Sequence, residues 1–297
     1  MDLSIIIPNY NTKELTYGCI SSIIEQTKKT THEIIVVDNA SSDGSASYFK
    51  KQFTPVRIIK NSDNLGFGKA CNQASLIAKG RYICILNSDI LLVQDIFPDL
   101  IKKLDENPEI AVLSPKLVDK DGRLQHSAGS FPNLINLKAW SLFLDDLPVI
   151  KKFFPAYHLE DPVFYQKERS FDWVQAACWI MKTSVFKKLG GFDQSIFMYG
   201  EDVDFCYRTA RAGFKNWYFP QTKVVHLAHG KSSGGYILGE YQGLMHFFRK
   251  YHSEWMFLLK LILQVNAFNR MTIFGILLGN GTQKKNYQEA LVRLAKL

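Results

Sequence analysis

The first 120 residues alternate short apolar runs with segments in which apolar side chains recur at helical spacing. Continuous apolar runs are typical of strands buried on both faces, and four occur here: Leu3–Ile7, Glu33–Asp38, Val56–Lys60 and Tyr82–Asn87. The segments with helical spacing lie between them, at residues 12–27, 43–52 and 66–79. This alternation predicts an α/β fold in which helices flank a mostly parallel sheet with right-handed crossovers.

The pattern is interrupted after residue 120. Residues 120–170 are rich in aromatic side chains and proline and show no clear period. Because long irregular insertions are usually functional, we interpret this one as a binding loop, with a small buried subdomain as the alternative. Its candidates for contact with lipid are Trp140, Phe143, Phe153 and Phe154 beside Lys151 and Lys152.

Regular elements are predicted on both sides of this insertion. They are a helix near 94–106, a strand near Ile110–Ser114, a strand region at Trp173–Met181, helices near 183–189 and 202–212, and strands at Phe214–Pro220 and Lys223–His226.

Composition and cysteine usage indicate a cytoplasmic protein. With 46% hydrophobic residues the chain can bury a substantial core. The five cysteines are scattered and form no C-x-x-C pair, which argues against a disulfide framework or a zinc site and favours a reducing compartment. The N-terminus has no basic segment before its short apolar run, so we do not expect a signal peptide.

Most of the positive charge lies at the C-terminal end. The net charge is +8, and residues 249–297 carry +6 of it, interleaved with aromatic and leucine side chains. Such a segment suits an anionic membrane surface better than nucleic acid. The apolar stretches 255–265 and 271–279 are shorter than the roughly 20 residues of a spanning helix. We therefore expect residues 251–297 to form basic amphipathic helices in the membrane interface, with packing on the rest of the protein as the alternative.

Two predicted strands end in carboxylates. An apolar run that ends at Leu86 is followed by Asn87, Ser88 and then Asp89, and Asp38 ends the strand at 33–38. In open α/β sheets, ligands bind at the carboxyl ends of strands. Asp89 is a candidate ligand for Mg²⁺ or Mn²⁺, which proteins often hold through one carboxylate and substrate phosphates. Asp38 is a candidate for ribose or base contact. Ordinary turn chemistry explains either residue equally well in isolation.

A glycine-containing turn precedes the helix at 66–79. The segment from Asn64 through Gly66 and Gly68 matches half of a dinucleotide fingerprint but follows the third strand, so NAD binding is a poor interpretation. Small residues at this helix start, with Asn72 inside the helix, allow close backbone approach to a ligand.

The acidic cluster at 201–204 supplies a candidate base. Asp202 lies at a helix start, where the helix dipole favours the ionised carboxylate, and helix capping is the alternative role. Asp204 and Arg208 are spaced for an i,i+4 pair. Downstream, His226 ends a predicted strand, and its neutral imidazole suits Mn²⁺ unless it is purely structural. Phosphate contacts are predicted for Lys231, Ser232 and Ser233.

Six motifs in this order resemble the family 2 glycosyltransferases of the GT-A fold, and most of all their bacterial rhamnosyltransferase group. They are IIIPNYN, VVDNASSDGS, NLGFGKACNQA, ILNSD, GGFDQSIFMYGEDVDFCYRTARAGF and VVHLAHGKSS. The resemblance covers residues 3–250. It implies a catalytic domain at 1–250, with a nucleotide-binding half (1–120) and an acceptor-binding half (120–250), followed by the tail at 251–297.

The resemblance also implies roles for individual residues. Asp89 corresponds to a metal ligand, and His226 to a later contact with the metal or the diphosphate. Asp202 corresponds to the general base, and Glu201 and Trp179 to acceptor contacts. The donor nucleotide would contact Pro8, Tyr10, Asn11, Asp38, Asn39, Asn64, Gly66, Asn72, Asn87 and Ser88. Asn87 stands where the family's DxD motif has its first Asp, which leaves a less anionic metal site.

The predicted function is inverting transfer of L-rhamnose from dTDP-L-rhamnose to a lipid-linked saccharide in cell-surface polysaccharide synthesis, with Mg²⁺ or Mn²⁺ as cofactor. The alternatives are transfer from a UDP-hexose or UDP-N-acetylhexosamine, and a non-catalytic glycan-binding or scaffold protein. The expected location is the inner face of the cell membrane, as a peripheral protein. Its expected partners are donor, acceptor and membrane surface, with a homodimer as an option and no nucleic acid.

Overall fold

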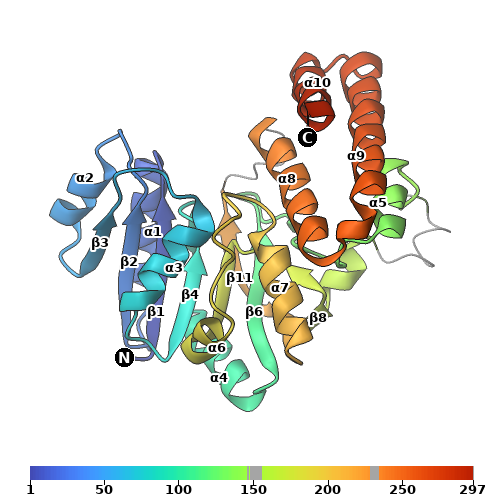
Figure 1. Cartoon of the computed structure of the whole chain (residues 1–297). Coiled ribbons are helices and arrows are strands. Elements are labelled where there is room, and N and C mark those ends of the chain that lie inside the picture. Colours follow the sequence, from blue (N-terminus) through green and yellow to red (C-terminus); the bar gives the residue numbers. More distant parts are fainter. Residues whose placement is uncertain (146, 148–155, 228–233, 297) are drawn as a thin grey trace. The chain divides into compact units, whose positions relative to one another are not determined.

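The predicted alternation of strands and helices is present in the structure, a computed structural model that describes residues 1–145, 147, 156–227 and 234–296 (Figure 1). The first strands are β1 (Leu3–Asn9), β2 (His32–Asp38), β3 (Val56–Lys60) and β4 (Tyr82–Leu86). The helices between them are α1 (Lys13–Gln26), α2 (Ser45–Gln52) and α3 (Phe67–Ile77). The element types in this half of the chain are as predicted, and the boundaries differ by a few residues.

These four strands are mutually parallel and lie in the order β3-β2-β1-β4 within a nine-stranded sheet. The register pairs Asn9, the last residue of β1, with Asp38, the last residue of β2. Parallel strands present their carboxyl ends at one edge of the sheet. The polar residues that end these strands therefore share one edge.

The remaining strands make the sheet mixed. They are β5 (Ile90–Leu92), β6 (Ile110–Val118), β8 (Arg169–Phe171), β10 (Cys178–Lys182) and β11 (Lys215–His226). β10 lies antiparallel between β4 and β6, and β11 runs parallel to β6 but antiparallel to β5 and β8. The two strands predicted at 214–220 and 223–226 are one strand, β11. Its pairing with β6 shifts register between Phe219 and Lys223, which accommodates Pro220, a residue without an N–H for the ladder.

Several shorter helices, turns and strands lie between and around these strands. They are α4 (Phe97–Glu106), β7 (Ala128–Gly129), the 3₁₀ turns Pro162–Tyr165 and Ser253–Trp255, β9 (Trp173–Val174), α6 (Thr183–Lys188) and α7 (Glu201–Arg211).

The centre of the sheet is completely buried. Every residue of β4 is inaccessible to solvent, as its uninterrupted apolar run predicts. All five cysteines lie in the described part of the chain, and all are buried free thiols. Burial raises the pKa of the Cys19 and Cys206 thiols.

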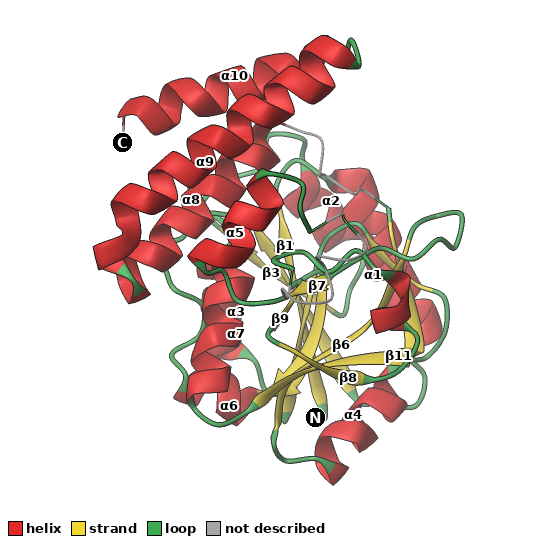
Figure 2. Cartoon of the chain, turned by 90° about the vertical axis from the view of Figure 1, so that its right-hand side faces the viewer, coloured by secondary structure: helices red, strands yellow, loops and turns green. Residues whose placement is uncertain are grey.

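The chain divides into two compact units. The sheet unit comprises Met1–Ala128, Glu160–Phe197 and Asp202–Ala228. The helical unit comprises Gly129–Leu159, Met198–Glu201 and His229–Leu297. Within the helical unit, α8 (Gly234–Tyr251), α9 (Met256–Arg270) and α10 (Gly281–Lys296) pack against one another (Figure 2). A π-helical stretch, Met271–Leu277, follows α9 directly.

The insertion at 120–170 contains a helix that the sequence pattern did not reveal. Asn133 and Asn136 form a reciprocal capping box at the start of α5 (Leu134–Ser141), and α5 packs on α9. Trp140 is buried, with the Arg270 guanidinium 4.9 Å from its ring centroid. Trp140 therefore belongs to the core of the helical unit rather than to an exposed loop. Phe143 is partly buried, and its ring lies 6.4 Å from that of Phe274 between centroids, whereas the candidates at 151–154 lie outside the described residues.

α9 is apolar on two faces. Leu259, Leu263 and Ala267 are buried, whereas Phe257 and Phe268 are 72% and 56% exposed. Leu261 and Val265 lie between these two on the exposed face, and both are also exposed. None of the helices in the described ranges has the length and apolarity that crossing a bilayer requires.

Candidate active site

The Asp38 side chain is completely buried at the end of β2. Its Oδ1 accepts a hydrogen bond from Asn9 Nδ2 at 2.7 Å, across the paired ends of β1 and β2. Its Oδ2 is also buried and has no hydrogen-bond partner among the described residues. A buried carboxylate oxygen is costly unless a donor reaches it. Asp38 is thus equipped to receive an N–H or O–H from a ligand.

A chain of polar side chains joins Asp38 to the loop that contains Asp89. Asn9, bonded to Asp38, presents its Oδ1 2.9 Å from Thr12 Oγ1. Thr12 Oγ1 also lies 3.1 Å from Ser88 Oγ, next to Asp89. Sequence reasoning selected neither Asn9 nor Thr12. The available signal was the polar residue Asn9 that closes the apolar run of β1.

Carboxamides form a second series beside Asp38. Gln73 Nε2 donates to Asn61 Oδ1 at 2.9 Å, and Asn61 Nδ2 donates to Asn39 Oδ1 at 2.8 Å. Asn39 Nδ2 then donates to the Gly66 carbonyl at 3.2 Å. Asn39 is therefore placed by the ends of two strands and by the turn before α3.

Asp89 and His226, the two predicted metal ligands, come together. Asp89 ends the turn after β4, and the antiparallel pairing of β5 with β11 places His226 opposite Ile90. His226 Nε2 lies 3.4 Å from Asp89 Oδ2, and both side chains are almost fully buried. The Leu227 N–H donates to the Asp89 carbonyl at 3.0 Å, which fixes the backbones together.

This pair fits a divalent cation that a substrate completes. One oxygen and one imidazole nitrogen suit Mn²⁺. Two ligands about 2.1 Å from a cation and at right angles lie about 3 Å apart, close to the observed separation. The part of the chain that the structure describes contains no group of three or more His, Cys, Asp or Glu side chains arranged to hold a metal. A divalent cation held by one or two protein ligands typically takes its other ligands from phosphate oxygens and water.

Asp202 lies in the first turn of α7 and is partly buried. Its Oδ1 accepts from the Val203 N–H at 2.9 Å, and its Oδ2 lies 3.4 Å from the Ala176 N–H. The next residue, Ala177, accepts the Asn87 N–H at 2.9 Å through its carbonyl. The two adjacent alanines therefore contact both the base candidate and the turn that carries Asp89.

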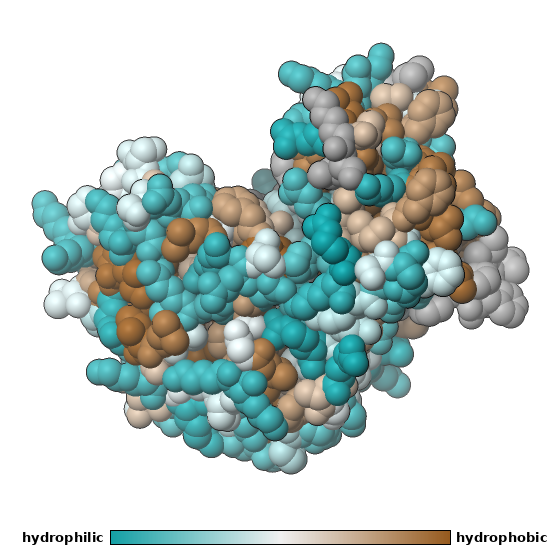
Figure 3. Space-filling model, in the orientation of Figure 1, coloured by the Kyte–Doolittle hydropathy of each residue, from teal (hydrophilic) through white to brown (hydrophobic). Residues whose placement is uncertain are grey.

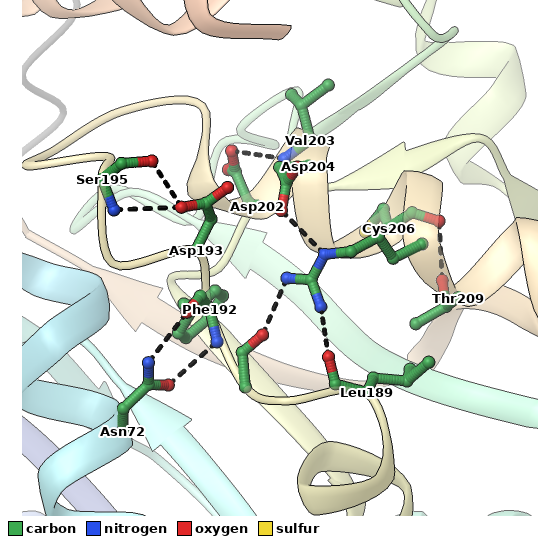
Figure 4. A network of polar contacts seen from close by, with 12 residues as sticks. Asn72, Leu189, Phe192, Asp193, Ser195, Asp202, Val203, Asp204, Cys206 and Thr209 are labelled. Atoms are coloured by element: carbon green, nitrogen blue, oxygen red, sulfur yellow. Dashed lines mark hydrogen bonds and ion pairs between the residues drawn. The ribbon is translucent and has the colours of Figure 1, made fainter. Parts of the chain in front are cut away.

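A network of hydrogen bonds around Arg208 holds α7 in place (Figure 4). Arg208 Nε donates to Asp204 Oδ2 at 2.8 Å, which confirms the i,i+4 pair predicted from the sequence. Its two terminal nitrogens donate to the carbonyls of Leu189 and Gly191 at 2.6 and 2.7 Å. One guanidinium thus connects α7 to the loop that follows α6.

Asn72 holds the same loop from the other side. Its Nδ2 donates to the Phe192 carbonyl at 2.8 Å, and its Oδ1 accepts the Phe192 N–H at 2.9 Å (Figure 4). A Cβ on Gly191 would lie 2.3 Å from Asn72 Oδ1, and one on Gly66 would lie 2.1 Å from the Phe197 carbonyl oxygen. Gly66, which was expected to allow close approach of a ligand, therefore accommodates the backbone of Phe197, and Gly191 accommodates the Asn72 side chain. Asn72, predicted to contact the nucleotide, binds Phe192.

Trp179 departs furthest from expectation. It lies in β10 with no exposed surface, and its ring packs 5.8 Å from Phe192 and 5.9 Å from Phe205 between ring centroids. A side chain buried in an aromatic cluster cannot present a surface to an acceptor. We therefore assign Trp179 to the core and leave it out of the acceptor site proposed below.

The other predicted site residues lie around the same strand ends or in the turns beside them. Tyr10 is 48% exposed directly after β1, and Pro8 is partly exposed near its end. Asn11 adopts φ 53° and its Oδ1 accepts the Ser42 N–H at 2.8 Å. Asn64 Oδ1 accepts the Gly66 N–H at 3.0 Å. Glu201, which directly precedes Asp202, is buried. Lys231, Ser232 and Ser233 lie outside the described residues.

Comparison with known proteins identifies relatives among the glycosyltransferases. The model of the family "Glycosyl transferase family 2" matches residues 4–189. The N-acetylglucosaminyl-diphospho-decaprenol L-rhamnosyltransferase of Mycobacterium tuberculosis is 27% identical over 243 residues, which cover 75% of this chain and 76% of that protein.

Solved structures share the fold at low sequence identity. A mannosyltransferase from Pyrobaculum calidifontis, in complex with GDP-Man and Mn²⁺, has a TM-score of 0.58 at 18% identity, over 99% of this chain and 84% of that chain. GalNAc-T7 with UDP, GalNAc and Mn²⁺ has a TM-score of 0.59 at 17% identity, over 82% of this chain and 47% of that chain. The fold is therefore that of the GT-A glycosyltransferases, with a mostly parallel central sheet flanked by helices. Because the family model matches more than half of its length, the chain belongs to glycosyltransferase family 2 and is a glycosyltransferase.

Proposed function

We propose that this glycosyltransferase transfers L-rhamnose from dTDP-L-rhamnose to a lipid-linked saccharide during the synthesis of a surface polysaccharide. The polar chain from Asp38 through Asn9 and Thr12 to Ser88 carries the proposal, because it connects the residue proposed to contact the nucleoside with the turn proposed to lie beside the diphosphate. The rhamnosyltransferase relative supports the choice of donor and acceptor.

The reaction would be a single displacement with inversion. The acceptor hydroxyl oxygen forms a bond to the anomeric carbon while the bond from that carbon to the diphosphate oxygen breaks. Asp202 receives the hydroxyl proton, and Glu201 orients the acceptor. Asp38 receives a hydrogen bond from the nucleoside. Asp89 and His226 would hold Mg²⁺ or Mn²⁺, whose charge stabilises the departing diphosphate.

A donor panel tests this function. We expect the purified full chain with Mn²⁺ to transfer from dTDP-L-rhamnose to a lipid-linked N-acetylglucosamine at least tenfold more efficiently, as kcat/KM, than from UDP-glucose or UDP-N-acetylglucosamine. Preference for a UDP-sugar would support the alternative donor class. If the protein neither transfers nor hydrolyses any of these donors, the result would favour a glycan-binding protein. Undiminished transfer in EDTA would contradict the metal role of Asp89 and His226.

The exposed face of α9 supports a position at the inner face of the membrane. Brown, apolar side chains gather over the region of α9 in Figure 3, where Phe257, Leu261, Val265 and Phe268 are exposed. The basic C-terminal segment supplies attraction to anionic lipid. Interfacial helices bind by such apolar burial combined with charge. Association of two copies in a homodimer stays a prediction.

Vesicle binding tests this position. Replacing both Phe257 and Phe268 by Glu removes two side chains whose burial in lipid contributes about 1.5–3 kcal/mol each. We expect the bound fraction on phosphatidylglycerol vesicles to fall at least fivefold in sedimentation. Leu76→Glu, at an exposed apolar position of α3 in the sheet unit, is the control and should change binding less than twofold. Equal binding of the double variant and the wild type would contradict a role of the exposed α9 face in membrane binding.

A further inference from the structure

Gln125 makes two hydrogen bonds to His226, one to its backbone and one to its ring. Gln125 Nε2 donates to the His226 carbonyl at 2.9 Å, and Gln125 Oε1 lies 2.8 Å from His226 Nδ1. Gln125 is itself buried, in the segment after β6, where its N–H donates to the Leu117 carbonyl at 2.9 Å. Neither the sequence pattern nor the family resemblance pointed to this residue.

The backbone contact determines how the carboxamide is oriented. A carbonyl oxygen only accepts hydrogen bonds, so the group facing the His226 carbonyl must be the NH₂ of Gln125. The group facing Nδ1 is then the Gln125 carbonyl oxygen, which also only accepts. His226 Nδ1 must therefore carry the proton. In the neutral imidazole this leaves the lone pair on Nε2.

That lone pair faces Asp89. His226 Nε2 and Asp89 Oδ2 lie 3.4 Å apart. With Nδ1 protonated, both atoms are electron-pair donors, and a cation bound by both satisfies them together. Histidine ligands in metal sites usually donate their other ring N–H to a neighbouring acceptor, which fixes tautomer and orientation. Here Gln125 is the acceptor.

We propose that Gln125 is a positioning residue that presents the Nε2 lone pair of His226, together with Asp89, to a divalent cation. The inference rests on the metal role proposed above for Asp89 and His226. It assigns to Gln125 control of metal affinity, without contact to either the cation or the substrate.

Metal affinity is the first test. Gln125→Met keeps the size of the side chain but removes both hydrogen bonds, whereas Gln125→Glu keeps an acceptor for Nδ1–H. The dissociation constant of Mn²⁺ is measured by electron paramagnetic resonance with saturating dTDP, and again with UDP. We expect Gln125→Met to raise it about 10- to 100-fold, the usual effect of removing such a partner. The dissociation constant of the Gln125→Glu variant should lie closer to that of the wild type. Gln221→Met, at an exposed position of β11, is the control and should match the wild type.

The tautomer is the second test, and it needs no metal. Proton–nitrogen spectra of the ¹⁵N-histidine-labelled protein, at a pH where the ring is neutral, should show His226 protonated at Nδ1. Gln125→Met should shift the ring toward the Nε2–H form. A wild type protonated at Nε2 would overturn the inference, as would equal Mn²⁺ affinity in wild type and Gln125→Met. Failure of the wild type itself to bind Mn²⁺ would instead overturn the metal role of Asp89 and His226, and the inference with it.

Discussion

Replacing Asp202 by Asn should lower kcat for sugar transfer about 10²- to 10⁴-fold, the range for loss of a general base. The Asn side chain retains an oxygen that can accept the Val203 or Ala176 N–H, so the first turn of α7 keeps its contacts. The amide cannot take a proton from the acceptor hydroxyl. The variant therefore separates the catalytic role of Asp202 from a capping role.

Three measurements distinguish these roles. Initial rates at saturating acceptor give kcat, dTDP affinity reports on the donor site, and thermal unfolding reports on the fold. Asp193→Asn is the matched control, because Asp193 also accepts a backbone N–H, from Ser195 at 3.0 Å in an exposed turn (Figure 4). We expect unchanged dTDP affinity in both variants and near-normal kcat in the control. A kcat for Asp202→Asn within threefold of the wild type would exclude Asp202 as the base.

Replacing Arg208 by Ala should lower the free energy of unfolding by about 3–5 kcal/mol, as is typical when one partner of a buried ion pair is removed. Asp204 is fully buried and would lose the guanidinium at 2.8 Å. The carbonyls of Leu189 and Gly191 would lose their donors as well. Because these contacts tie α7 to the preceding loop, we also expect kcat to fall.

The helical unit offers a control with the same spacing. Arg293 and Glu289 form an i,i+4 pair at 2.7 Å on α10, but both side chains are about half exposed. Exposed pairs of this kind contribute about 0.3–0.5 kcal/mol, so Arg293→Ala should be nearly neutral in urea unfolding. Similar losses in the two variants would show that burial of Asp204 does not determine the strength of the Arg208 pair.

The sequence was sufficient to predict which strands lead into the carboxylates of the candidate site. Asp38 and Asp89 follow uninterrupted apolar runs, and parallel strands bring their carboxyl ends to one edge. Local spacing also predicted the pair between Asp204 and Arg208, because it depends only on helical geometry.

Contacts between distant segments could not be predicted from periodicity. His226 lies beside Asp89 because β11 pairs with β5, and only the family resemblance anticipated this. Gln125 reaches His226 through the segment after β6, which has no regular pattern. The contact of Asn72 with Phe192 could not be foreseen, because Phe192 lies in a loop whose path local sequence does not determine. The burial of Trp179 could not be foreseen either, because an aromatic residue of a buried strand and one of a binding site look alike in sequence.

The burial of every cysteine has a practical consequence for following movements of this enzyme. Thiol reagents act on the thiolate at accessible sites, and here all five thiols are buried, with the pKa of Cys19 and Cys206 raised. The natural protein should therefore react slowly with a maleimide spin label or fluorophore. One cysteine introduced on the sheet unit and one on the helical unit would take up the label selectively. The distance between the two units could then be measured in solution, with and without donor, without first removing any native cysteine.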